Sequence, residues 1–230
     1  MLREQGSKLG MTIILALLAL LFVIATAACN SSELLPTSPS PIPTKSMAAS
    51  LTVKGDPQDI VLPLEALPAG FQKATGEYEG SNEYNVVYFR PEALTCKEGC
   101  GTNLMAIIVN LGIYQDAGAA REKGQAQGNL DRDSIMNSIR EAYEEASPID
   151  VQPYIVQLKD TDYVIAFHVE YTISSIVVTE YRYRIIINNA LANVIVSARA
   201  ARAGEDQSAF GELARTIVEN QVARINRARS

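Results

Sequence analysis

Two cysteines and one histidine are the residues of this sequence best suited to bind a metal or to carry redox chemistry. Cys96 and Cys100 lie in the segment TCKEGCG, and His168 is the only histidine among the 230 residues. Because soft thiolates select Cu(I), a copper or thiol-redox site built from these three residues is one hypothesis. A single histidine disfavours most zinc sites, which usually need more than one nitrogen ligand when the thiolates are paired with each other.

The spacing of the two cysteines resembles that of the copper site in Sco-type assembly proteins. This resemblance implies Cu(I) bound by Cys96, Cys100 and His168. However, no proline follows Cys100, and the strand order does not indicate a thioredoxin fold. The second hypothesis is a local disulfide between Cys96 and Cys100, because thiols outside the cytoplasm tend to be oxidised. We expect the disulfide, with no metal and no cofactor, and we keep copper as the alternative.

A polar strand face is the other candidate site. The segment 163–173 alternates between an aromatic and aliphatic face and a face that carries His168. In the segment 177–187, arginines alternate with tyrosines in the same way. If these strands pair, their polar residues are expected to share one sheet face, which would be either a ligand-binding surface or a solvated face with cross-strand ion pairs. The predicted face consists of His168, Glu170, Arg182, Arg184 and Arg199.

The strands that must position these residues can be predicted from runs of β-branched and aromatic residues bounded by Gly, Pro and Asn. Asn188 and Asn189 separate two of the runs and predict a tight hairpin, because asparagine tolerates a positive φ. A weaker run at 71–80 is expected to form a hairpin with the next one. The predicted strands are 71–80, 83–90, 103–114, 154–159, 163–173, 177–187 and 190–200.

Two helical regions are also expected. The first runs from Asp116 to about Ser147, with Asp116 as its N-cap and Asp133 as the cap of its firmer second half. The second runs from about Glu205 to Arg227. Its apolar residues recur at helical spacing. The predicted inner stripe consists of Phe210, Ala214, Ile217, Val218, Gln221 and Ile225.

The order of these elements is strands, helix, strands, helix. Strands joined by hairpins, with only two main helices, predict an α+β fold in which both helices pack on one face of a mostly antiparallel sheet. The segments 105–124 and 193–214 share a layout of strand, short polar turn and Ala-rich helix start. This similarity suggests an internal duplication.

The N-terminus has the features of a secretory signal. A polar start with two basic residues precedes the uncharged segment 11–28, and Cys29 follows directly. The sequence Thr26-Ala27-Ala28-Cys29 resembles the lipobox of bacterial prolipoproteins, although Thr26 stands where that family usually has leucine. The resemblance implies cleavage after residue 28 and diacylglycerol on the Cys29 sulfur. The alternative is a retained transmembrane anchor, because 18 residues at about 1.5 Å each nearly span a bilayer core.

Residues 29–50 are expected to form a flexible tether, because they are rich in serine and proline and cannot bury much apolar surface. Residues 51–230 follow as a single α+β domain. This layout places the domain outside the cytoplasm in a bacterial cell envelope, attached to a membrane through its N-terminal lipid. Firm attachment needs more than one acyl chain, which diacylglycerol supplies.

Recognised catalytic motifs are absent from the sequence. There is no Gly-x-Ser-x-Gly elbow, no His-Glu-x-x-His motif and no glycine-rich phosphate loop. A net charge of −6 disfavours nucleic acid as a partner. We therefore expect a non-enzymatic domain that binds an unknown protein, peptide or small molecule. The alternatives are the copper or thiol-redox accessory and an unrecognised hydrolase of envelope polymers, the latter motivated by location alone.

Overall fold

The computed structural model describes residues 51–95, 103–128, 130–200 and 208–230. The segment Thr52–Ser230 forms one compact unit. No helix within the described residues is both long and apolar enough to cross a membrane. The predictions of a signal peptide, a lipid anchor, a tether and a disulfide concern residues outside this part of the chain, namely 1–50, Cys96 and Cys100.

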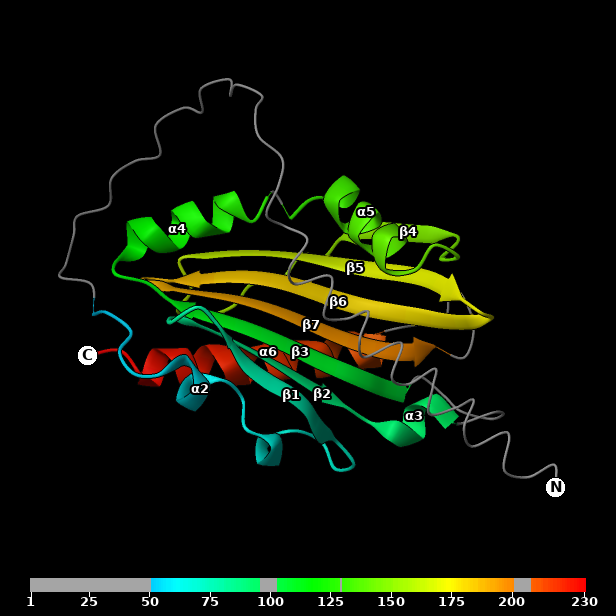
Figure 1. Ribbon diagram of the computed structural model, residues 1–230, viewed down its shortest axis with the longest axis horizontal. Coiled ribbons are helices and arrows are strands. Elements are labelled where there is room, and N and C mark those ends of the chain that lie inside the picture. Colours follow the sequence, from blue (N-terminus) through cyan, green and yellow to red (C-terminus); the bar gives the residue numbers. More distant parts are fainter. Residues whose placement is uncertain (1–50, 96–102, 129, 201–207) are drawn as a thin grey trace, which may run out of the picture. The chain divides into compact units, whose positions relative to one another are not determined.

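The described strands form one antiparallel sheet of seven strands in the order β1-β2-β3-β7-β6-β5-β4 (Figure 1). The central pair, β3 and β7, joins two meanders, because β1 to β3 are consecutive neighbours and so are β4 to β7. The sheet thus brings segments that are far apart in the sequence side by side. The strands are β1 (Gln72–Glu79), β2 (Glu83–Phe89), β3 (Asn103–Ile113), β4 (Ile149–Pro153), β5 (Tyr163–Ile173), β6 (Ile176–Ile187) and β7 (Ala190–Ala200).

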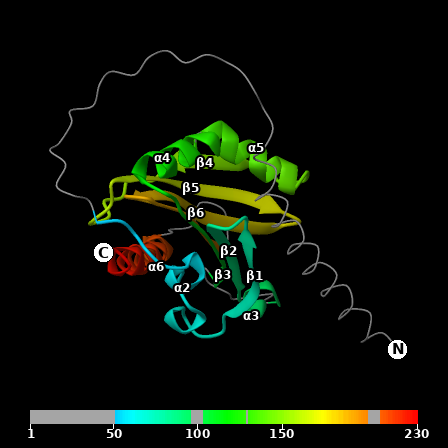
Figure 2. The ribbon, with the colours of Figure 1, turned by 60° about the vertical axis from the view of Figure 1, so that its left-hand side comes forward.

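The helices lie on both faces of this sheet (Figure 2). Ile217 and Val218 of α6 belong to the same core cluster as Tyr183, whereas Ile139 of α5 packs in a separate cluster with Val169. We call the two sides the α6 face and the α4–α5 face. The helices are α2 (Pro57–Ile60), η1 (Leu64–Ala66), α3 (Pro91–Thr95), α4 (Ala117–Ala126), α5 (Arg132–Ala142) and α6 (Ser208–Arg227).

The α+β class and the antiparallel sheet are confirmed, but the expectation that both main helices pack on one face is wrong. In β6, the alternating residues Tyr181, Tyr183 and Ile185 are buried on the α6 face, while Val178 and Ile186 are buried on the other. A sheet with apolar side chains on both faces must be covered on both. The internal duplication stays a prediction.

The helical region expected at 116–147 consists of two helices. The predicted cap Asp116 is confirmed, since its side chain accepts a hydrogen bond from the Ala119 N–H at 2.8 Å. Gly128 follows α4 with φ +77°, a conformation that favours glycine and ends a helix. Asp131, and not Asp133, caps α5, in a capping box with Ser134. The break allows α4 and α5 to pack on different strands.

The strand predicted at 154–159 is also wrong. The edge strand β4 lies just before it, at Ile149–Pro153, and pairs with β5. Ile155 is 93% exposed, whereas Leu158 is buried in the core with Tyr154 packed beside it. The alternation in this segment therefore reflects one-sided packing on the core and not pairing in the sheet.

The hairpins and the last helix agree with the sequence. Strands β1 and β2 pair as a hairpin, and β6 and β7 join through Asn188, whose φ is +52°. Asn189 also holds the start of the domain, because its side chain exchanges hydrogen bonds with the backbone of Val53. The predicted inner stripe of α6 is confirmed, since all of its members are buried: Phe210, Ala214, Ile217, Val218, Gln221 and Ile225.

Candidate functional site

The polar face predicted from β5 and β6 is divided between the two sides of the sheet. His168 pairs with Tyr181, and Phe167 pairs with Arg182. Directly paired residues share a face, so the histidine lies on the α6 face and the arginine on the α4–α5 face. The prediction of one shared face is wrong. Glu170 lies with His168, and the α4–α5 face carries Arg182, Arg184 and Arg199.

The turn between β5 and β6 explains this outcome. Ser174 and Ser175 both have positive φ, at +47° and +69°, and they form a two-residue connection that pairs Ile173 with Ile176. A tight turn of this kind sets the register, and a shift of one residue would exchange the faces. Sequence alternation alone identifies the residues of a face within one strand, but not which faces meet across strands.

His168 is half-buried on the α6 face. Its Nε2 lies 2.8 Å from the Oγ1 of Thr179, and its ring lies 4.9 Å from that of Tyr181. Burial lowers the pKa of His168, while the carboxylates of Glu170 and Asp150 oppose this shift. Within the described ranges, no group of three or more His, Cys, Asp or Glu side chains is arranged to hold a metal ion.

A buried ionic cluster lies beneath α5. Glu180 and Arg182 are 5% and 7% exposed, and Glu180 Oε2 accepts from both Nε and Nη2 of Arg182 at 2.8 Å. Glu180 Oε1 accepts from the hydroxyls of Tyr171 (2.8 Å) and Ser197 (3.1 Å), and Arg182 Nη1 donates to Ser138 of α5 at 3.1 Å. Burial disfavours the charge of Arg182, but Glu180 together with Tyr171 and Tyr143 outweighs this effect, so the pKa of Arg182 is raised.

This ionic cluster has the properties of a structural element. Both carboxylate oxygens of Glu180 have partners, and the cluster reaches α5 through Ser138. Buried charges are tolerated when they are paired and hydrogen-bonded in this way. The cluster therefore docks α5 on the sheet and offers a ligand little unused hydrogen-bonding capacity.

Arg184 docks α4 in a similar way. Its Nη1 donates to the carbonyls of Gly124 (2.9 Å) and Gly128 (2.6 Å), at the C-terminal end of that helix. A cation is favourable there because the carbonyl end of a helix carries partial negative charge. Its Nε donates to Asn193 Oδ1 at 2.9 Å, and partial burial lowers the pKa of Arg184. This contact connects α4 to a row of amides on the sheet.

Three asparagines, Asn85, Asn110 and Asn193, lie side by side across β2, β3 and β7, and we call them the amide row. Asn85 pairs with Asn110, and Asn110 pairs with Asn193. Asn193 is well bonded, since it accepts from Arg184 and donates to Gln127 Oε1 at 3.1 Å. Asn85 is 9% exposed, and its buried Oδ1 has no hydrogen-bond partner. The row thus has a bonded end at Asn193 and an unbonded end at Asn85.

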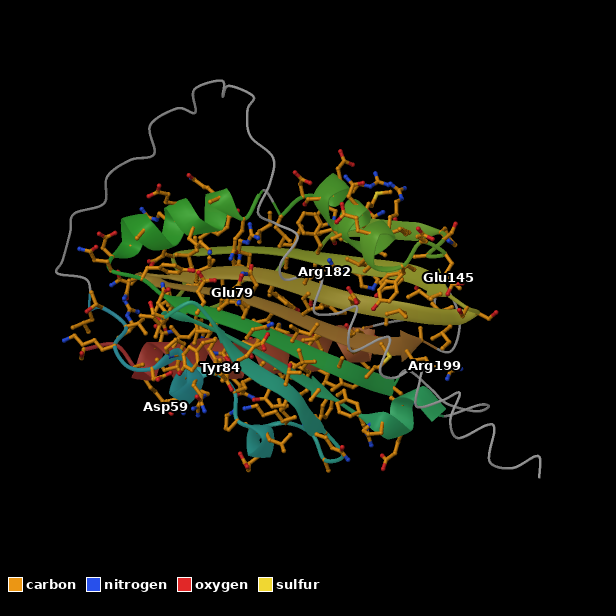
Figure 3. The ribbon with its side chains drawn as sticks, viewed as in Figure 1. Asp59, Glu79, Tyr84, Glu145, Arg182 and Arg199 are labelled. Carbon is orange, nitrogen blue, oxygen red and sulfur yellow. The ribbon has the colours of Figure 1, made fainter. Side chains whose placement is uncertain are left out.

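Acidic residues border the unbonded end of the row. Lys123 Nζ lies 2.8 Å from Glu83 Oε1, while Glu83 Oε2 is buried without a hydrogen-bond partner. The pKa of the nearby Tyr114 hydroxyl is raised, first by burial and then by the Glu83 carboxylate. On the edge strand β1, Glu77 pairs with Asn85 and Glu79 pairs with Glu83 (Figure 3 labels Glu79, Arg182 and Arg199 of this face).

This arrangement can recognise a ligand through hydrogen bonds. An amide offers two donors and an acceptor oxygen, and a carboxylate oxygen accepts. Leaving such groups buried and unpaired costs about 1–3 kcal/mol each, so an exception to their pairing requires an explanation. Helices α4 and α5 make their main contacts with β4, β6 and β7. The unpaired groups lie at the other half of the face, on β2 and its neighbours.

The sequence contains a signal for the amide row that is separate from the alternation of polar and apolar residues. Each of the three asparagines stands within a run of β-branched and other apolar residues, in EYNVVYF, AIIVNLGI and ALANVIV. Asparagine is depleted in strands, so each is an exception to local preference. Only the pairing of β3 with β7 shows that these three exceptions are neighbours.

Comparisons with known proteins leave the family open. No family model matches the chain, and no curated protein matches it. The extracellular domain of PknH from Mycobacterium tuberculosis has a TM-score of 0.39 and 9% identity, covering 74% of this chain and 94% of that one. An uncharacterised protein from Mycobacterium smegmatis has a TM-score of 0.33 and 13% identity, covering 74% and 83%. At such low TM-scores, neither likeness carries an argument about function.

Proposed function

We propose that this protein is a lipid-anchored extracytoplasmic binding domain whose ligand contacts the amide row. The observation that carries the binding role is the unpaired Oδ1 of Asn85, which is buried next to the half-buried Asn110. A ligand that supplies hydrogen bonds would offset the desolvation of these amides. The site lies on strands, which hold its side chains more precisely than loops do.

The location rests on the sequence of the N-terminus. The uncharged segment 11–28, followed by Cys29 and a Ser/Pro-rich stretch, supports export, lipidation and a tether. Labelled fatty acid should enter the full-length protein, and Cys29→Ala should abolish both the labelling and the firm membrane attachment. A Cys29→Ala variant that keeps its membrane attachment would support the retained transmembrane anchor instead.

The binding role is tested most directly on the asparagine side chains. The segment Thr52–Ser230 is a compact unit that contains every core cluster of the described residues, so residues 51–230 can be studied as a soluble domain. Side-chain NH2 signals of Asn85 and Asn110 in ¹⁵N-correlated NMR spectra should shift when peptide, saccharide or small-molecule fractions of bacterial envelopes are added. If no fraction moves these signals, the binding role at the amide row is wrong.

The two alternatives receive no specific support from the described residues. His168 is packed against Thr179 and Tyr181, and Cys96 and Cys100 lie outside the described ranges. Thiol counting on the exported, unreduced protein distinguishes a disulfide from free thiols, and Cu(I) uptake after reduction would support the copper role. Turnover of envelope polymers by residues 51–230 would support the hydrolase.

A further inference from the structure

We infer that the amide row binds the hydroxyl groups of an uncharged saccharide. This inference rests on the proposed function and specifies its ligand. It comes from three features of the same face: a buried acceptor without a partner next to a half-buried amide, a local charge balance that disfavours ionic ligands, and an apolar strip directly beside the amides.

The amides of the row suit a ligand that both donates and accepts. Asn85 Oδ1 is a buried acceptor without a partner, so it needs a donor, whereas the Glu83 carboxylate has the hydroxyl of Tyr114 beside it. Asn110 lies beside Asn85, half-buried, and its amide can both donate and accept. A sugar hydroxyl also does both. An ammonium group would donate to the oxygens but could not accept from the amide nitrogens.

The charges around the row argue against an ionic ligand. Glu83 already has Lys123 as its counterion at 2.8 Å, so a cation would have to displace an existing partner. Glu77 and Glu79, both exposed on β1 beside this end of the row, would repel a phosphate or a carboxylate. Burying a neutral hydroxyl against neutral amides also costs much less than burying a charge.

The next row of the same face is apolar. Val87 pairs with Ile108, and Ile108 pairs with Ile195, one step along the strands from the amide row. Ile108 and Ile195 are half-buried, so part of their surface is exposed beside the asparagines. A pyranose ring has polar hydroxyls at its rim and C–H groups on its faces. The polar and apolar rows together match both kinds of surface.

The experiment is an NMR titration of residues 51–230 with three probes: maltohexaose, chitohexaose and the neutral saccharide fraction of bacterial envelopes. At least one probe should shift the side-chain signals of Asn85 and Asn110 saturably. Asn85→Leu, a change of similar volume, should weaken binding about tenfold, as the loss of one or two hydrogen bonds predicts. The exposed Asn137→Ala on α5 is the matched control and should bind as the wild type does.

Other results separate the inference from the proposed function. If peptide fractions shift the Asn85 and Asn110 signals and the three saccharide probes do not, the saccharide inference is overturned while the binding role stands. Binding that Asn85→Leu leaves unchanged in a correctly folded variant also overturns the inference. If no probe or fraction of any class moves the signals, both are overturned.

Discussion

Two groups of polar residues lie on the α4–α5 face, and they use their hydrogen bonds differently. Around Glu180 and Arg182, three further side chains bond to a buried ion pair, and both carboxylate oxygens have partners. At the unbonded end of the amide row, Asn85 and Glu83 are equally buried, yet each has an oxygen without a partner. Both groups are buried, so burial alone does not distinguish a structural polar group from a binding one.

The difference lies in what covers each group. The ion pair lies beneath α5, which supplies Ser138 as a partner, and Arg184 connects the same half of the sheet to α4. The unbonded end lies on β2 and β3, outside the main contacts of those helices, and α4 reaches it through Lys123 at Glu83. A polar group that the protein itself has paired stabilises the fold. A polar group that it has left unpaired costs stability, and a ligand that bonds to it would recover that cost.

The largest expected effect comes from breaking the ion pair. Arg182→Met should lower the free energy of unfolding by about 3–5 kcal/mol, because it leaves the Glu180 carboxylate buried without its counterion. Urea denaturation at pH 7 measures this. The double variant Glu180→Met/Arg182→Met should recover much of the loss, since it removes both charges. A loss below about 1 kcal/mol for Arg182→Met would show that the cluster is not the structural element proposed here.

Breaking the Lys123–Glu83 pair should cause a smaller loss of stability. Lys123→Met should lower the free energy of unfolding by about 1–2 kcal/mol, because the Glu83 side chain is 6% exposed while that of Lys123 is 36% exposed. Chemical denaturation of the two proteins gives the difference. Lys159→Met, at an exposed position, is the matched control and should change stability by less than about 0.5 kcal/mol. Equal effects for the two lysines would contradict the contact.

Substitution by leucine should change the free energy of unfolding in opposite directions at the two ends of the amide row. Asn193→Leu should destabilise the domain by about 1 kcal/mol, because Arg184 and Gln127 lose a partner. Asn85→Leu should be neutral or stabilising by up to about 1 kcal/mol, because it removes an unpaired buried oxygen. Thermal and urea unfolding of both variants test the contrast. Destabilisation of equal size at both sites would mean that Asn85 is already paired.

The smallest effect is a pH dependence from His168 on the opposite face. Burial lowers its pKa in the folded state, so the unfolded chain binds the proton more readily. The destabilisation caused by His168 should be absent well above the ordinary histidine pKa of about 6.5. The free energy of unfolding should fall as the pH drops below that value. Unfolding free energies at pH 7.5 and 5.5 should therefore differ less in His168→Gln than in the wild type. An unchanged pH dependence in this variant would contradict the assignment.

Sequence periodicity and turn residues determined most of the elements, because both act locally. The alternation in 163–173, the turn at Asn188 and the buried stripe of α6 all involve neighbours along the chain, and all agree with the structure. The errors also have local causes. The pattern at 154–159 has the period of a strand but packs on one side only, and Gly128 divides a helical region whose apolar spacing continues beyond it.

Only the tertiary structure decided which polar residues meet. The two-residue turn at Ser174 and Ser175 sets a register that separates His168 from Arg182, although alternation within each strand is equally compatible with the opposite arrangement. The pairing of β3 with β7 brings Asn110 beside Asn193, which lies far along the chain. Side-chain periodicity is a property of one strand, whereas a shared face is a property of register between strands. For that reason the sequence predicted an α+β domain, and the amide row emerged only from its folded sheet.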